Sequence, residues 1–227
     1  MPDSPRRSRP VGPVAIIGLG AFGGTVAADL AGFGHHVIGI DIDERQVDAL
    51  SETVAQALIA DARDERALKD AGVDQCDAVI IAMGEDLEAN IVGAMNARVL
   101  GVGQIWVKSR TRTHQRILTR IGVDHVINPE RDMGHRVAQM IHNPFVTDYM
   151  TAAGNLTVVS LSAPESLRGK SLDEVDFSGL HGIECLGSVR KGRLARPGDG
   201  ATIEPGDMLL LLGKRSDLQR FGEITCT

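Results

Sequence analysis

Three glycines and one aspartate have the types and spacing of a nucleotide-binding turn. Gly18, Gly20 and Gly23 follow the apolar run Val14 to Ile17, and Asp41 comes about 20 residues later. In such turns the first glycine makes the tight bend, the second admits a pyrophosphate to the backbone, and the third lets the following helix approach the strand. The N-terminus of that helix offers unpaired N–H groups to phosphates. The sequence therefore predicts a nucleotide site in which Asp41 accepts hydrogen bonds from a ribose.

These residues need a parallel sheet to hold them together, and the pattern of residues 13–128 predicts one. Apolar runs alternate there with helical patterns, and Ala78 to Ala82 lacks the polar alternation of a half-exposed strand. Such runs are typical of parallel strands that helices cover on both faces. We expect an α/β fold with a Rossmann-like, doubly wound parallel sheet, whose ligand lies outside the carboxyl ends of the strands. The residues expected at those ends are Gly18, Asp41, Asp61, Ala82 to Gly84, Lys108 and Asn128.

The segments on either side of this sheet have different patterns. Residues 1–12 contain three prolines and three arginines and are expected to form a disordered tail. Residues 129–154 predict a connector of two helices, Asp132 to His142 and Val146 to Ala153, whose apolar face would dock on a second copy of the chain. Residues 155–227 predict a small α+β lobe of short strands and turns, with a short helix at Leu172 to Phe177.

Composition argues against several classes of protein. The 227-residue chain has a net charge of −6 and 3% aromatic residues, so it lacks the basic and aromatic surface of a nucleic-acid-binding protein. Three scattered cysteines fit free thiols in a reducing cytosol. No apolar run reaches the length of a membrane-spanning helix, so we expect a cytoplasmic location.

Several longer motifs carry a resemblance to a known family. They are GLGAFGG at 18–24, GIDID at 39–43, ADARD at 60–64, IAMGEDLEANI at 81–91, IWVKS at 105–109, INPERDMG at 127–134, LRGKSLDEVDF at 167–177 and IEPGDMLLLLG at 203–213. The chain resembles the RCK-domain regulatory subunits of bacterial potassium uptake systems of the Ktr and Trk type. INPERDMG is the most specific motif, because ordinary dehydrogenases do not have it there. The resemblance implies a Rossmann-like N-terminal lobe (13–128), crossover helices (129–154) and a small C-terminal lobe (155–227).

The resemblance implies regulation rather than catalysis. It implies a homodimer that assembles into a ring, expected to be an octamer, and that docks on an integral-membrane potassium channel or transporter. The ring would lie peripherally on the inner face of the cell membrane and would change shape with the bound nucleotide. The chain is thus expected to be a gating subunit for potassium ion transport, without nucleic acid as a partner.

The resemblance also implies roles for individual residues. The glycine turn and Lys108 would contact phosphates, Asp41 and Asp43 the ribose, and Asp61 the adenine. Glu130 matches a family acid that contributes to a divalent-ion site between subunits, holding Mg²⁺ or Ca²⁺. The cofactor-binding residues expected are Gly18, Gly20, Ala21, Phe22, Gly23, Asp41, Ile42, Asp43, Asp61, Ala62, Ala82, Met83, Gly84 and Lys108.

The identity of the ligand stays open at this point. Ktr-type chains commonly carry an arginine between the second and third glycines, directed at a γ-phosphate in the neighbouring subunit, and this chain has Ala21 instead. ATP or ADP, NAD(H), or both are therefore expected. The C-terminal lobe resembles lobes that bind cyclic di-AMP, with Ile183 and Pro197 near the apolar wall and Arg168 and Arg190 as nearby cations.

Alternative interpretations exist for the whole chain and for single residues. A Rossmann-like sheet also fits an NAD(P)-dependent oxidoreductase or a soluble NAD(H) redox sensor. Against the oxidoreductase, the C-terminal lobe is too small and strand-rich to enclose a substrate. Asp41 could cap the next helix, Lys108 could be a solvated strand end, and Glu130 could be only a first-turn helix acid.

Overall fold

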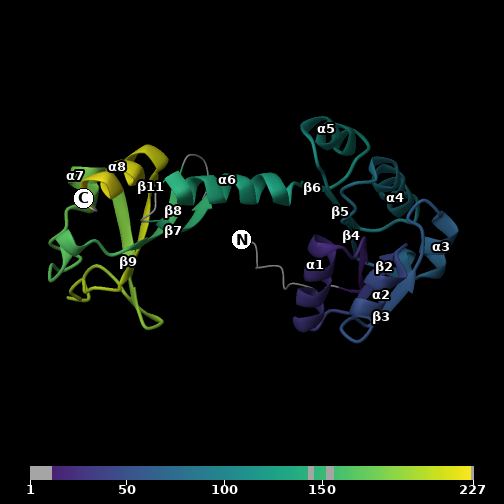
Figure 1. The fold of residues 1–227 in the computed structure, drawn as a ribbon, viewed down its shortest axis with the longest axis horizontal. Coiled ribbons are helices and arrows are strands. Elements are labelled where there is room, and N and C mark those ends of the chain that lie inside the picture. The colour runs from purple at the N-terminus through teal and green to yellow at the C-terminus, as the bar shows by residue number, and fades with distance from the viewer. Residues whose placement is uncertain (1–11, 143–145, 152–155, 226–227) are drawn as a thin grey trace, which may run out of the picture. The chain divides into compact units, whose positions relative to one another are not determined.

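The computed structural model describes residues 12–142, 146–151 and 156–225, which form two compact units (Figure 1). The N-terminal unit ends at Glu130 and the C-terminal unit begins at Arg131. Nearly all of the predicted tail lies outside the described residues. Within the described ranges, no helix combines the length and the apolarity needed to cross a bilayer.

The N-terminal unit is built on a six-stranded parallel sheet with the strand order β3-β2-β1-β4-β5-β6. Its strands are β1 (Val14–Ile17), β2 (Val37–Asp41), β3 (Gln56–Ile59), β4 (Ala78–Ile81), β5 (Gln104–Lys108) and β6 (His125–Ile127). Its helices are α1 (Ala21–Gly32), α2 (Glu44–Leu50), α3 (Glu65–Asp70), η1 (Val73–Gln75), α4 (Leu87–Val99) and α5 (Arg112–Arg120). The order reverses between β1 and β4, so the predicted Rossmann-like, doubly wound sheet is confirmed.

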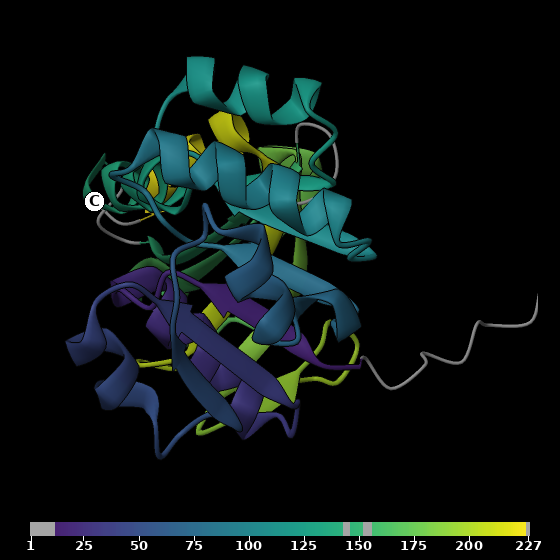
Figure 2. The same ribbon diagram turned by 90° about the vertical axis from the view of Figure 1, so that its right-hand side faces the viewer.

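Helices cover both faces of this sheet, which explains why its central strands are apolar along their whole length (Figure 2). Alternate residues of β1 belong to two hydrophobic clusters, one that includes α4 and α5 and one that includes α1 and α2. Ile17, the last residue of β1, lies opposite Ile40 of β2 and Ile81 of β4. The shared register brings the carboxyl ends of these strands to one edge of the sheet.

Helix α1 differs from its neighbours at its N-terminus. Asp43, Asp64 and Asp86 cap α2, α3 and α4, and each side chain accepts a hydrogen bond from a first-turn N–H group. Gly20 precedes α1 and has no side chain with which to do so. The N–H groups of the first turn of α1 are therefore available to an anionic ligand.

The C-terminal unit is built on a five-stranded antiparallel sheet with the order β10-β9-β11-β8-β7. Its strands are β7 (Val146–Thr151), β8 (Leu156–Ser162), β9 (Ile183–Arg190), β10 (Arg193–Ala195) and β11 (Met208–Lys214). The helices are α6 (Pro129–His142), which begins in the N-terminal unit, η2 (Glu165–Leu167), α7 (Phe177–His181) and α8 (Arg215–Thr225). Its core includes Ile183, Leu209 and Phe221. The arrangement matches the expected α+β lobe.

The prediction of a second connector helix at Val146 to Ala153 is wrong. Val146–Thr151 is strand β7, which pairs antiparallel with β8, and the last two residues of the predicted helix lie outside the described ranges. The β-branched and aromatic residues of VTDYMT favour a strand once β8 is present to pair with it. In the part of the predicted connector that the structure describes, there is therefore one helix, α6, followed by strand β7, instead of two helices.

The predicted helix at Leu172 to Phe177 is also wrong, because α7 begins only at Phe177. Residues 171–174 form one turn, in which the Ser171 N–H donates to Glu174 and the Glu174 N–H donates to the Ser171 hydroxyl. Ser171 also forms an isolated bridge with Thr202. These contacts hold the segment against the rest of the lobe before a helix can continue.

Candidate nucleotide site

A cavity of about 710 Å³ opens at the carboxyl ends of strands β1 to β5. The glycine turn, the strand ends and the first turn of α1 line it, and all of its residues belong to the N-terminal unit. It lies beside the point between β1 and β4 where the strand order reverses. Sheets of this kind bind their ligands at that point.

Most of the predicted site residues line this cavity. They are Gly18, Gly20, Ala21, Phe22, Asp41, Ile42, Asp61, Ala62, Ala82, Met83, Gly84, Lys108 and Glu130. Gly23 and Asp43 do not line it. The cavity also includes Ile17, Ala60, Arg63, Glu85, Asp86, Ala89 and Arg110, which the sequence motifs did not single out. The binding roles themselves stay predictions.

The glycine turn has the geometry that its spacing predicts. Gly18 has a φ of +94°, a left-handed conformation that side chains disfavour. A Cβ atom on Gly23 would lie 1.8 Å from the Gly18 carbonyl oxygen, so this glycine lets α1 start directly against the turn. A Cβ atom on Gly20 would meet nothing within 4 Å, which leaves open space where the backbone faces the cavity.

Asp41 links the end of β2 to the glycine turn. Its Oδ2 accepts a hydrogen bond from the Leu19 N–H at 2.6 Å, and its Oδ1 accepts one from the Asp43 N–H at 2.9 Å. A carboxylate has about four acceptor positions, so each oxygen can still accept a ribose hydroxyl from the cavity side. Asp41 is not the cap of α2, and the interpretation of it as a mere helix cap is wrong.

Asp43 holds the cap position instead. Its Oδ1 accepts a hydrogen bond from the Arg45 N–H at 3.0 Å, and its Oδ2 accepts one from the Arg45 guanidinium at 2.7 Å. The Arg45 guanidinium lowers the pKa of Asp43. In this structure Asp43 therefore serves α2 rather than the cavity, which corrects its predicted placement beside the ribose.

Arg63 lines the cavity, although it was not among the predicted site residues. Its guanidinium donates to Asp61 Oδ2 at 2.8 Å and lies 3.6 Å from Asp86 Oδ2. This contact lowers the pKa of Asp61 and keeps its carboxylate charged at the edge of the cavity. Arg63 lies within the quoted motif ADARD at 60–64 and shares an Asp-x-Arg spacing with Asp43 and Arg45, but neither pattern predicted that it would line the cavity.

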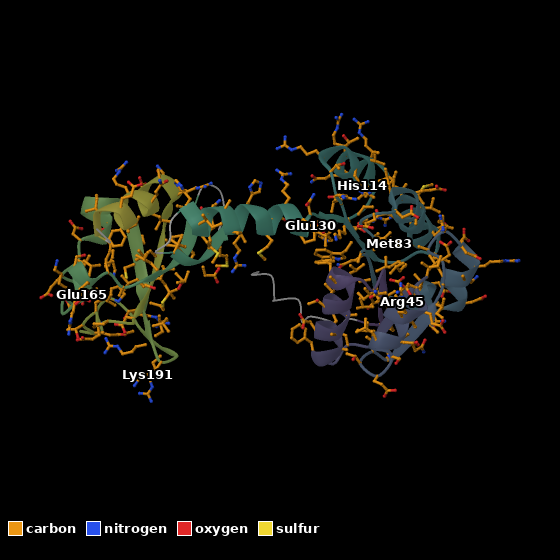
Figure 3. All side chains as sticks on the ribbon, viewed as in Figure 1. Arg45, Met83, His114, Glu130, Glu165 and Lys191 are labelled. Atoms are coloured by element: carbon orange, nitrogen blue, oxygen red, sulfur yellow. The ribbon has the colours of Figure 1, made fainter. Side chains whose placement is uncertain are left out.

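Lys108 and Glu130 form an ion pair at the other side of the cavity. Lys108 Nζ lies 2.5 Å from Glu130 Oε1 and 5.7 Å from the centre of the Phe22 ring, at the first turn of α1. The Lys108 side chain is only 14% exposed, so it is not a solvated strand end. The Lys108 ammonium lowers the pKa of Glu130, which is labelled in Figure 3.

The donor set around Glu130 does not by itself fit a divalent ion. Across the ranges that the structure describes, no three His, Cys, Asp or Glu side chains gather as metal ligands. The nearest partner of Glu130 is an ammonium group, which repels a cation. The predicted Mg²⁺ or Ca²⁺ site therefore stays a prediction that needs donors from outside this chain.

A buried network fixes the ends of β4 and β5 beside the cavity. The Asn90 side-chain amide donates to the carbonyl oxygens of Met83, at 2.5 Å, and Lys108, at 3.2 Å. Its oxygen lies 3.1 Å from His114 Nε2, and the Arg110 N–H donates to His114 Nδ1 at 3.4 Å. Because Nδ1 accepts, Nε2 carries the hydrogen of a neutral ring. Figure 3 labels His114 and Met83, which this network joins through Asn90. No local sequence pattern predicted this network, because Asn90 lies 18 residues from Lys108 and 24 from His114.

The C-terminal unit contains a second hollow, of about 360 Å³, lined by residues of β9, β10 and the segment before β11. Of the residues expected to bind cyclic di-AMP, Arg190 lines it. Ile183 does not form an exposed wall, because it is 1% exposed inside the core of the lobe, and Arg168 pairs with Glu165. The cyclic di-AMP site stays a prediction, with Ile183 removed from it.

Known protein families match both units. The TrkA-N domain matches residues 14–129, and the TrkA-C domain matches residues 156–225. The N-terminal match covers the sheet and the cavity, up to the first residue of α6.

Known proteins are similar over nearly their whole length. The chain is 34% identical over 209 residues to Ktr system potassium uptake protein C of Bacillus subtilis (strain 168), covering 91% of this chain and 94% of that protein. It is 34% identical over 205 residues to Ktr system potassium uptake protein A of Vibrio alginolyticus, covering 90% and 93%.

Solved structures share the fold. The GsuK RCK domain has a TM-score of 0.66 and 18% identity over 97% of this chain and 49% of that chain, so this chain spans about half of it. The TrkA-N domain of inner membrane protein ybaL from Escherichia coli has a TM-score of 0.51 and 19% identity over 58% of this chain and 97% of that one. With both domains matched, the predicted resemblance is confirmed, and the chain belongs to the TrkA-N and TrkA-C family of Ktr-type potassium uptake proteins.

Proposed function

We propose that this chain is a nucleotide-binding regulatory subunit of a potassium uptake system. Its relatives of similar length are Ktr system potassium uptake proteins. The observation that carries the proposal is one cavity that combines the glycine turn, the open N-terminus of α1 and the carboxylate of Asp41. On this proposal a homodimer assembles into a ring, expected to be an octamer, on the cytosolic side of an integral-membrane potassium channel or transporter.

The ligand we propose contains adenosine 5′-diphosphate, which ATP, ADP and NAD(H) share. Asp41 supports a free ribose, because a carboxylate at this position repels the 2′-phosphate of NADP. The N-terminus of α1 supports a phosphate group next to that ribose. A channel of the same fold, GsuK, has been solved bound to NAD, with a TM-score of 0.63 and 19% identity over 93% of this chain and 39% of that chain.

Regulation requires that the ligand favour one shape of the protein over another. The Lys108–Glu130 pair is suited to this, because Lys108 lines the cavity and Glu130 lies in the first turn of α6. A phosphate that approaches Lys108 would compete with Glu130 for the ammonium group. If Lys108 bound the phosphate, its ion pair with Glu130 would be lost, and the first turn of α6 would lose that contact with the end of β5. The bound nucleotide would thereby shift the preferred position of α6.

Calorimetric titration of nucleotide-stripped protein with ATP, ADP and NADH tests the binding part of the proposal. Asp41→Ala should weaken binding by about 1–3 kcal/mol, because a charged acceptor for the ribose is lost. The matched control is Asp43→Ala, which removes a carboxylate two residues away that does not line the cavity. The control should keep its affinity while losing about 1 kcal/mol of stability as a helix cap.

Equal affinity in Asp41→Ala and wild type, with the fold intact, would show that Asp41 only braces the glycine turn. The regulatory part is tested by potassium flux into vesicles that contain the membrane partner, with and without nucleotide. Flux that ignores the nucleotide would contradict gating. Steady oxidation of NADH with a small-molecule substrate would instead favour the oxidoreductase interpretation.

A further inference from the structure

Three cationic side chains line the cavity, and two of them form ion pairs with carboxylates. Arg63 pairs with Asp61, and Lys108 pairs with Glu130. Within the ranges that the structure describes, no carboxylate lies at ion-pair distance from the exposed guanidinium of Arg110. Together with Lys108, the positive charge of Arg110 helps to lower the pKa of Glu130, but the guanidinium donates to no carboxylate there, so it can still bind an anionic group of the ligand.

The order of the strands places Arg110 on the side of the cavity away from the ribose position. Asp41 ends β2 on one side of the glycine turn, whereas Arg110 follows β5, two strands beyond β1 on the other side. Neighbouring strands lie about 4.8 Å apart, so the ends of β1 and β5 are roughly 10 Å apart. A nucleotide with its ribose at Asp41 and its first phosphate at α1 extends any further phosphates toward β4 and β5.

The backbone that carries Arg110 is held in place, while its side chain stays exposed. The Arg110 N–H donates to His114 Nδ1, and the N–H of the neighbouring, fully buried Ser109 donates to the Ile127 carbonyl oxygen at 2.7 Å. Thr111 then caps α5 by accepting a hydrogen bond from the His114 N–H. The base of the side chain is thus fixed before any ligand arrives, which lowers the cost of ordering it.

We propose that Arg110 is a specificity-determining residue that binds the phosphates beyond the first one of an adenine nucleotide. It would set a preference for ADP and ATP over AMP. A guanidinium suits this role because its planar fork can donate two parallel hydrogen bonds to phosphate oxygens. The inference rests on the proposed nucleotide site and adds to it a residue that distinguishes ADP and ATP from AMP.

Calorimetric titration of the nucleotide-stripped full chain with AMP, ADP and ATP tests this role. Arg110→Ala should lose about tenfold in affinity for ADP and ATP, as expected for a hydrogen-bonded charged contact. Its affinity for AMP should change less than about twofold. Arg110→Lys should recover part of the loss, because it keeps the charge but not the fork.

Two control variants distinguish a direct contact between Arg110 and the phosphates from a general effect of removing a positive charge. Arg112→Ala removes the same charge from an exposed position on α5 that does not line the cavity, and all three affinities should stay unchanged. Arg63→Ala removes a lining cation on the ribose side, so it should not change the ratio of ATP to AMP affinity. Unfolding curves confirm that each variant is folded.

The possible failures are distinguishable. If wild type binds ADP and ATP and Arg110→Ala binds them equally well, or loses AMP by the same factor, the inference is wrong and the proposed function stands. If wild type binds none of the three nucleotides and not NADH, the proposed function fails and the inference fails with it. Binding of NADH alone would overturn the inference and keep a nucleotide site.

Discussion

The carboxylates of Asp41 and Asp207 show how the two units use the same chemical group differently. Asp207 stands just before β11 in the C-terminal unit and is fully buried. It accepts the Arg190 fork at 2.6 and 2.7 Å and the Glu204 N–H at 2.9 Å. Asp41 ends β2, is half-buried and lines the cavity. Among the described residues, its side chain accepts hydrogen bonds from the two backbone N–H groups named above.

The difference separates a structural carboxylate from a candidate binding one. Asp207 is fully buried and accepts three hydrogen bonds from its own lobe, so a ligand would have to displace those donors to reach it. Asp41 keeps acceptor capacity on the side where the cavity lies. Arg190 and Arg110 differ in the same way, since Arg190 is committed to Asp207 and to the Thr202 carbonyl oxygen. Partners already in place, rather than charge alone, decide which polar residues are free to bind.

The largest effect is expected from Gly23→Ala, which should disrupt the glycine turn beside Asp41 in the N-terminal unit and leave the C-terminal unit unchanged. Its Cβ atom would lie 1.8 Å from the Gly18 carbonyl oxygen and 2.9 Å from the Ala82 Cβ atom, so the backbone must shift. We expect a loss of about 3 kcal/mol in the free energy of unfolding and loss of nucleotide binding. Urea unfolding followed by the fluorescence of Trp106 reports on this unit, because the chain has one tryptophan.

Gly32→Ala is the matched control for that variant. It lies at the other end of α1, where an added Cβ would meet nothing within 4 Å. Its stability should be unchanged or slightly raised, because alanine favours a helix more than glycine does. A Gly23→Ala protein as stable as Gly32→Ala would refute the close packing of helix and turn.

The next effect is expected from Asp207→Asn, which should destabilise the C-terminal unit and leave the cavity intact. The charged partner of Arg190 is lost at a buried position, which should cost about 2 kcal/mol. Circular dichroism in urea measures the loss, and calorimetry should show the nucleotide affinity of wild type. Glu165→Gln, in the exposed pair with Arg168, should cost less than about 0.5 kcal/mol. If Asp207→Asn weakened nucleotide binding, Asp207 would not have a purely structural role in the C-terminal unit.

The smallest effect is expected from pH acting on the network beside the cavity. Burial lowers the pKa of His114 below its ordinary value of 6.5. Below pH 6.5 the unfolded chain binds a proton that the folded unit resists, so this part of the stability is complete above pH 6.5 and falls as the pH drops toward the folded pKa. We expect a loss of about 1 kcal/mol or less between pH 7.5 and 5.5.

Trp106 fluorescence in urea at the two pH values measures this loss in the unit that contains His114. His114→Gln should remove this part of the pH dependence, whereas His36→Gln, at an exposed position, should keep it. The same pH dependence in His114→Gln and wild type would show that the buried ring is not its source.

Much of the fold could be predicted from local sequence patterns. The alternation of apolar runs and helical segments predicted each strand of the N-terminal sheet, and the glycine spacing predicted the turn before α1. These features depend on residues close together in the chain. The two wrongly predicted helices lie where contacts with distant residues determine the secondary structure. Strand β7 depends on pairing with β8, and Ser171 forms a bridge with Thr202.

The sequence by itself determined the doubly wound sheet, the glycine turn and the position of Asp41 at a strand end, because periodicity and turn chemistry act over a few residues. Only the tertiary structure decided which polar groups are already paired. Asn90 reaches Lys108 and His114 across 18 and 24 residues, and Lys108 reaches Glu130 from a different element. Folding brings such residues together through packing that no local pattern encodes. Among the described residues, it leaves no carboxylate at ion-pair distance from Arg110 at the cavity.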